Sequence, residues 1–312
     1  MLRKYALFVG VAAIGALVTS CGGGNGGTPT PTDTSTATPT PTPSATTVDF
    51  SLTQDFSTQS VNANLALAWF MATGGTTETF NGGARVNGIS TIALALSPES
   101  VTFNNPDLTA AVTFAGSELV SSSSTLRSYA RTDESLQLSV PFGNTLQVTY
   151  EQSLPFTRAS VDGTLRARKV AFFFNPVTTT SDITTDLTYT GTVQVAGGDP
   201  GTTLSDAISS PTTTFTVQAS DEHVVGTLMI YELVNNVSTL IATLPVDAVV
   251  NSTSTFSGTF ADTTHNLSGS FVGSLTGANR DELFILFSVS GNADASDSTD
   301  DRRYVGSFIG SN

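Results

Sequence analysis

The sequence predicts an all-β protein built from antiparallel strands. Thr, Ser, Val, Phe and Gly dominate the chain after the first fifty residues, whereas Met occurs only 3 times in 312 residues. Apolar residues recur at alternate positions over short stretches, and these stretches are separated by clusters of Gly, Asn, Asp and Thr. Period-two alternation bounded by turn residues is typical of half-buried strands. Long amphipathic stripes of helical period are scarce.

The C-terminal region, residues 183–312, carries the most regular pattern. In Phe256–Phe260 and Leu267–Phe271 the large residues fall on one face, and the turn-like residues 262–265 join them into a hairpin. Glycines 258, 269, 273 and 306 fall inside strands, where they suit sharp bends or close backbone approach. Eight candidate strands follow one another: 187–196, 212–219, 224–233, 238–245, 254–261, 266–275, 282–291 and 304–310. Eight strands suffice to close a small antiparallel barrel, so we expect a C-terminal eight-stranded barrel.

The preceding region, residues 48–182, is less regular and predicts an N-terminal β subdomain. Residues 62–72 fit a strand or a short helix, because Ala and Leu occur beside Trp69 and Phe70; we favour the strand. The Thr-, Ser- and Asp-rich run 176–186 is the best candidate boundary between the two parts. The other candidate strands are 92–96, 111–114, 136–142, 146–150 and 165–174.

The N-terminus reads as a lipoprotein signal peptide over residues 1–20. Arg3 and Lys4 precede an apolar stretch that is too short for a comfortable membrane span. Cys21 follows Val-Thr-Ser as in a bacterial lipobox and is the only cysteine, so we expect its thiol to carry the lipid anchor. The alternative is an ordinary signal peptide with a free thiol, which suits an oxidising compartment poorly. Gly22, in place of an aspartate, favours the outer membrane.

Residues 21–47 form a Gly-, Thr- and Pro-rich segment that has almost nothing to bury. Such a composition predicts a disordered, extended spacer between the lipid and the folded part. Removal of residues 1–20 leaves 10 basic and 26 acidic residues, a net charge of about −16. An acidic surface repels phosphates, so a nucleic-acid partner is excluded. The expected partner is the membrane, through the lipid.

Candidate chemical sites are few. His223 and His265 lie in turns, and no G-x-S-x-G pattern accompanies them, so no catalytic residues are expected. The loop with Asp294, Asp297, Asp300 and Asp301 offers oxygen ligands suited to calcium but lacks calcium-loop spacing. It also has Arg302 and Arg303 beside it, so a solvated hairpin tip is the preferred interpretation, with no metal or other cofactor. Trp69–Phe70 and Phe172–Phe174 fit buried core better than ligand-contacting aromatics.

Three segments of the C-terminal third share a pattern with a known protein family: the hairpin Phe256–Phe271, the turn and strand Gly277–Leu283, and the ending Tyr304–Gly310. In these segments the chain resembles the transferrin-binding-protein-like surface lipoproteins. The chain departs from the family pattern at Phe284 and Ile285, where small residues or glycine are usual. The resemblance implies an eight-stranded barrel beside a handle-like β subdomain, without catalytic activity and facing outward. No loop motif matches, so transferrin binding is not carried over.

We therefore expect a non-catalytic outer-membrane lipoprotein, exposed at the cell surface, that binds an unidentified protein or solute through barrel-end loops. A periplasm-facing location is the alternative address. The alternative function is a structural envelope lipoprotein without a specific ligand, and a hydrolase with an unrecognised site is the third hypothesis.

Overall fold

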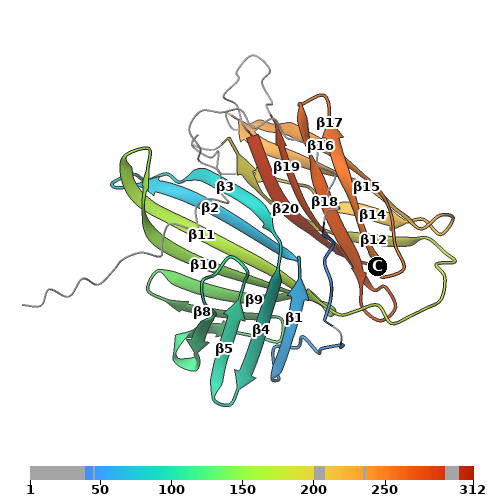
Figure 1. Ribbon diagram of the computed structural model, residues 1–312, viewed down its shortest axis with the longest axis horizontal. Helices are drawn as coiled ribbons and strands as arrows, with labels where there is room; N and C mark the ends of the chain where they lie inside the picture. The colour runs from blue at the N-terminus through green and yellow to red at the C-terminus, as the bar shows by residue number, and fades with distance from the viewer. Residues whose placement is uncertain (1–38, 45, 200–207, 235–236, 292–301) are drawn as a thin grey trace, which may run out of the picture.

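The computed structural model describes residues 39–44, 46–199, 208–234, 237–291 and 302–312. The described chain is all-β and antiparallel, and it forms three sheets (Figure 1). Apart from the short 3-10 helix η1 (Gly116–Glu118), its regular elements are strands. No helix within the described ranges is long and apolar enough to span a membrane.

Strands β1–β11 form the N-terminal lobe, in which a four-stranded sheet packs on one face of a seven-stranded sheet. In sheet order the four strands are β1 (Phe56–Val61), β4 (Ile89–Leu96), β5 (Glu99–Asn104) and β6 (Val112–Ala115). The seven strands, also in sheet order, are β3 (Thr79–Val86), β2 (Asn64–Ala72), β11 (Val161–Phe174), β10 (Thr145–Arg158), β9 (Glu134–Phe142), β8 (Leu126–Arg131) and β7 (Leu119–Ser122).

Strands β12–β20 form the C-terminal lobe, a single nine-stranded sheet. All eight strands expected there are present, because inward and outward side chains alternate as the sequence indicates. The two-residue strand β13 (Ile208–Ser209) is additional. The others are β15 (His223–Val234), β14 (Thr213–Val217), β12 (Leu187–Gly198), β20 (Arg302–Ser311), β19 (Glu282–Gly291), β18 (Leu267–Thr276) and β17 (Thr255–Asp262), with β16 (Val237–Val249) paired to β15.

The expected closed eight-stranded barrel is not confirmed. The sheet curls so that β16 and β17 lie next to one another (Figure 1), but no backbone ladder joins them among the described residues. Asn251 accepts hydrogen bonds from the Thr253 and Thr255 N–H groups in the turn between these strands. Their described link is a side-chain hydrogen bond from the Thr243 N–H to Asp262, 2.7 Å long. Between β16 and β17, this side-chain hydrogen bond therefore takes the place of the backbone ladder that a closed barrel would have.

The two lobes share a hydrophobic core, which we call the lobe interface. Its N-terminal half comes from alternate residues of β2 and β11, and its C-terminal half from the outer faces of β18, β19 and β20. Phe284, one of the positions that depart from the family pattern, is fully buried here and lies 4.5 Å from the Phe174 ring. A large residue is needed at this position because it fills the space between two sheets.

The expected spacer is not wholly separate from the body. Thr42 pairs with Val61 of β1, and the Pro39 carbonyl accepts a hydrogen bond from Arg85 of β3. The described residues 39–44 therefore lie against the N-terminal lobe.

Candidate functional site

A cleft opens between the lobes beyond the lobe interface. The reason lies in the side chains of β11 that face the C-terminal lobe. Phe174, Phe172 and Val170 are buried in the interface, but the next two residues on this face are Arg168 and Arg166. Because charged side chains cannot be buried against an apolar sheet without partners, the two sheets separate where the arginines begin. We call this space the inter-lobe cleft.

Two adjoining hollows of about 430 and 530 Å³ make up the cleft. Its N-terminal wall is one face of β2, β8, β9, β10 and β11, and its opposite wall is the outer surface of β12 and β20. Side chains that line it include Leu67, Trp69, Gln137, Gln147, Thr149, Glu151, Arg166, Arg168, Gln194 and Val305.

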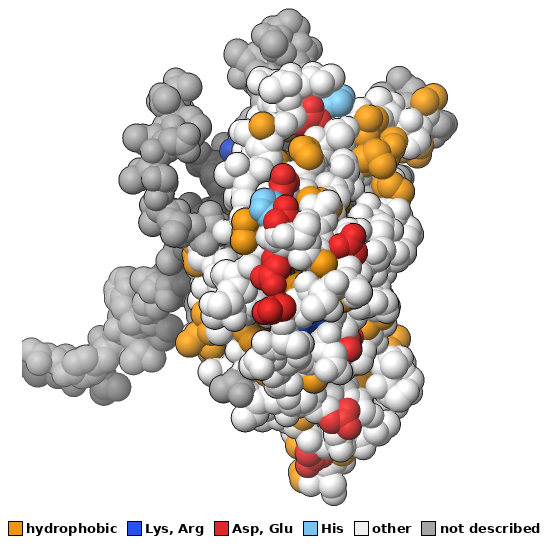
Figure 2. Space-filling view, turned by 90° about the vertical axis from the view of Figure 1, so that its right-hand side faces the viewer, with side chains coloured by type: hydrophobic (Ala, Val, Ile, Leu, Met, Phe, Trp, Pro, Cys, Tyr) orange, Lys and Arg blue, Asp and Glu red, His pale blue; other side chains and the backbone are white. Residues whose placement is uncertain are grey.

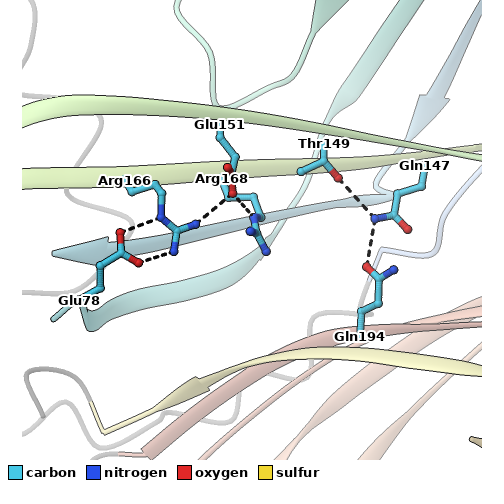
Figure 3. Close-up of polar contacts among 7 residues, drawn as sticks. All are labelled: Glu78, Gln147, Thr149, Glu151, Arg166, Arg168 and Gln194. Atoms are coloured by element: carbon cyan, nitrogen blue, oxygen red, sulfur yellow. Dashed lines mark hydrogen bonds and ion pairs between the residues drawn. The ribbon is translucent and has the colours of Figure 1, made fainter. Parts of the chain in front are cut away.

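An ion-pair network fixes the two arginines (Figure 3). Arg166 donates to both oxygens of Glu78, with Nε–Oε1 and Nη2–Oε2 distances of 2.8 and 2.5 Å. Its Nη1 lies 3.0 Å from Glu151 Oε1, and the Arg168 Nε lies 2.6 Å from the same oxygen. The hydrogen bond from Arg166 holds the pKa of Glu78 below its usual value. Each charge in the network therefore has an opposite charge beside it.

The indole of Trp69 supports these arginines. The guanidinium carbons of Arg166 and Arg168 lie 4.2 and 5.0 Å from its ring centroid. These distances are typical of cation–π contacts, which hold a cation over the face of the ring. Trp69 is itself buried, with 6% of its surface exposed. This burial confirms the prediction that Trp69 is a core residue. The indole also forms part of the cleft wall.

One hydrogen bond crosses the cleft between side chains of the two lobes. The Gln147 amide nitrogen on β10 lies 3.0 Å from the Gln194 amide oxygen on β12 (Figure 3). The same nitrogen lies 3.4 Å from the Thr149 hydroxyl. These neutral groups give the two walls of the cleft donors and acceptors without additional charge.

Neither histidine contributes to the cleft. The Nδ1 atom of His223 lies 2.6 Å from Asp247, and that of His265 lies 2.8 Å from Asp262. The hydrogen bond with Asp247 raises the pKa of His223. Within the described ranges, neither imidazole bonds to a hydroxyl or thiol, so neither pair forms a triad. Figure 2 shows acidic side chains and imidazoles spread over this outer face of the C-terminal lobe.

Most of the other sites expected from the sequence lie outside the part of the chain that the structure describes. Cys21, the expected lipidation site, and the weak calcium candidates Asp294, Asp297, Asp300 and Asp301 lie outside the described residues. Among the residues that are described, no group of three or more His, Cys, Asp or Glu side chains is placed to hold a metal ion. Phe172–Phe174 are fully buried, which confirms their interpretation as core.

Sequence reasoning missed the cleft. One signal was available, because Arg166, Arg168 and Lys169 place three cations in one strand of a chain that has only 12. Such a cluster in a strand of an acidic protein requires carboxylates nearby. Their identity depends on the tertiary structure, since Glu78 is 88 residues away from Arg166.

The sequence matches no protein-family model and no curated protein. Among solved structures, a mutant of transferrin binding protein B from Haemophilus parasuis Hp5 is similar, with 10% identity and a TM-score of 0.39. That match covers 83% of this chain and 61% of the other. The isotype 1 transferrin binding protein B from serogroup B Neisseria meningitidis gives 12% identity and a TM-score of 0.40, covering 80% and 43%.

A protein of unknown function of the DUF3598 family from Nostoc punctiforme gives 10% identity and a TM-score of 0.22, covering 80% of this chain and 96% of that one. The chain thus spans less than two thirds of each transferrin-binding chain. At these TM-scores the similarities assign no family and transfer no function.

Proposed function

We propose that this chain is a non-catalytic, lipid-anchored binding protein of the outer membrane that is exposed at the cell surface. The signal peptide, Cys21 and the spacer support the anchor, and the resemblance of the C-terminal strands to surface lipoproteins supports the location. The ligand is an unidentified protein or solute.

The inter-lobe cleft is the observation that carries the binding role. Its polar groups are already oriented: Glu78 and Glu151 position the two arginines, and Trp69 supports them from below. Preorganised donors and acceptors around a concave, partly apolar wall are typical of ligand sites. Binding was first expected at barrel-end loops, with no residues assigned; of the connections between the C-terminal strands, 200–207, 235–236 and 292–301 lie outside the described residues.

A cleft-filling variant tests the role of the cleft. Gln137 on β9 is exposed and lines the N-terminal wall of the cleft. Gln137→Trp should therefore fill part of the cleft without disturbing the core. We expect the full-length variant to lose capture of ligand from spent medium or neighbouring cells. Gln54→Trp is the matched control, because Gln54 is exposed and does not line the cleft. Equal capture by both variants would remove the cleft from the proposal.

The anchor is tested separately. Cys21→Ala removes the thiol that would be acylated, so the protein should move from the membrane to the soluble fraction, because acyl chains supply the membrane affinity. Fractionation of washed membranes gives the measurement. Retention of the variant in those membranes would contradict lipidation at Cys21.

Protease treatment of intact cells tests the location. The wild-type body should be digested while periplasmic control proteins survive. Survival of the body would place it on the periplasmic side and overturn surface exposure.

A structural envelope lipoprotein without a ligand is the second candidate. The observation that favours it is that the arginines of the cleft already have carboxylate partners, so the site needs no ligand to be electrostatically satisfied. Failure of the full-length protein to capture any ligand would favour this role.

A further inference from the structure

A further hollow, of about 370 Å³, lies where β3 faces the outer surface of β18, β19 and β20. We call it the Arg85 pocket. Its lining includes Arg85, Ser268, Ser270, Ser288, Ser290 and Val305. It shares Val305 with the inter-lobe cleft but includes none of the ion-paired residues of that cleft.

Arg85 stands out because its charge has no ion-pair partner among the described residues. Its Nη2 atom donates to the Pro39 carbonyl at 3.2 Å. Its Nε atom is buried and makes no hydrogen bond in the described part of the chain. None of the ion pairs among described residues includes it. Burial lowers the pKa of this guanidinium to about 10. A partly buried cation without an ion-pair partner is costly, and an anion beside it would offset that cost.

Four serines form the opposite wall. Ser268 pairs with Ser290 and Ser270 pairs with Ser288 in the ladder between β18 and β19. All four side chains face away from the core, because their neighbours Phe271, Phe287 and Val289 face into it. Each hydroxyl can donate one hydrogen bond, and none of the four bonds to another described residue.

We propose that the Arg85 pocket binds a small oxyanion: a phosphate, sulfate or carboxylate group. The guanidinium presents paired N–H donors that match two oxygens of such a group, and the serine hydroxyls supply donors from the other side. A protein with a net charge of −14 repels anions at long range. Binding must therefore come from these local donors, and it is independent of the lipid anchor and of the inter-lobe cleft.

Calorimetry and thermal unfolding of the full-length chain in a non-ionic detergent test this site. The probes are inorganic phosphate, sulfate and acetate, each compared with sodium chloride at matched ionic strength, because any salt screens the repulsion within so acidic a protein. We expect at least one probe to bind and to raise the melting temperature above the chloride baseline. The three probes separate tetrahedral oxyanions from carboxylates.

The variant Arg85→Gln should weaken that binding by about tenfold or more, since a charge-assisted pair of hydrogen bonds is lost. Its melting temperature in anion-free buffer should not fall, because the substitution removes a partly buried cation that has no ion-pair partner among the described residues. This result distinguishes lost binding from lost folding. Arg158→Gln is the matched control, since Arg158 does not line the pocket, and it should bind as the wild type does. Absence of binding by all three probes, or equal binding by Arg85→Gln, would overturn the proposal.

Discussion

Several glycines in the C-terminal strands leave room for an aromatic ring on the neighbouring strand. Gly306 pairs with Phe287, and a Cβ atom at Gly306 would lie 2.5 Å from the ring and 2.4 Å from the Gln194 carbonyl oxygen. Gly273 pairs with Phe256 and would place a Cβ atom 2.2 Å from that ring. At these two positions the sequence-based expectation of a close approach is confirmed. The aromatic ring of the neighbouring strand lies against the glycine and occupies the space that a side chain would need.

Replacement of Gly306 should destabilise the C-terminal lobe. Gly306→Leu would force Phe287 from its place in the core, and overpacking of this kind costs about 1–3 kcal/mol. Thermal or denaturant unfolding of the full-length chain gives the measurement. Gly143→Leu is the matched control, because a Cβ atom there meets nothing within 4 Å. A Gly306→Leu protein as stable as the control would argue against tight packing in this strand.

At the scale of elements, Asp262 joins β16 to β17. Besides the Thr243 N–H, its carboxylate accepts hydrogen bonds from the backbone N–H groups of Thr264 and His265 and lies 2.8 Å from the His265 Nδ1. Burial raises the pKa of Asp262, but these hydrogen bonds outweigh burial and hold the pKa below its usual value. The ionised carboxylate therefore stabilises the folded state.

This link should make stability depend on pH. A carboxyl whose pKa is lowered by folding contributes stability above its unfolded pKa of about 3.8 and loses that contribution as the pH falls through the lower folded value. At pH 7 we expect Asp262→Asn to be less stable than the wild type by about 1–3 kcal/mol. The difference should shrink in unfolding experiments below pH 4. Asp247→Asn, at an exposed carboxylate, is the control and should change stability little; a pH-independent gap for Asp262→Asn would contradict this role.

Strands were predicted well where apolar and polar residues alternate, as in β12 and β16, and where turn residues bound a short apolar run, as in β19. The expected strand at 62–72 is present as β2 and settles the choice between strand and helix. Strands β1, β3, β5, β7 and β8 were not predicted. In β3 two glycines and Arg85 interrupt the alternation, and β7 has only four residues. Such segments become strands because neighbours supply hydrogen bonds, which local pattern does not reveal.

At the scale of the whole molecule, Glu282 joins the two lobes beside their shared core. It is 2% exposed, and its two oxygens accept hydrogen bonds from the Asn144 N–H and the Thr145 hydroxyl, both 2.7 Å long. Burial raises the pKa of this carboxyl. Since Asn144 and Thr145 belong to the N-terminal lobe and Glu282 begins β19, this carboxyl links the two lobes through two hydrogen bonds.

Removal of this carboxyl should weaken the contact between lobes. Glu282→Ala leaves two buried donors without an acceptor, which costs about 1–3 kcal/mol for each unsatisfied group. Amide hydrogen exchange should rise in β18–β20 and in β2, where the lobes meet, and the melting temperature should fall. Glu282→Gln keeps one acceptor oxygen and should lose less. Unchanged exchange at the lobe interface in Glu282→Ala would show that the apolar core alone holds the lobes together.

The sequence by itself determined the all-β class, the eight C-terminal strands, the buried aromatic residues and the acidic surface, because local alternation decides which side chains face a core. The tertiary structure alone decided how β16 and β17 lie against one another in the curled C-terminal sheet. It also decided where the lobes join and where the inter-lobe cleft and the Arg85 pocket open. These features depend on contacts between distant residues: Glu282 bonds with Asn144 across 138 positions and Gln147 with Gln194 across 47. No local sequence pattern encodes such pairs, since these hydrogen bonds form only once the sheets have packed.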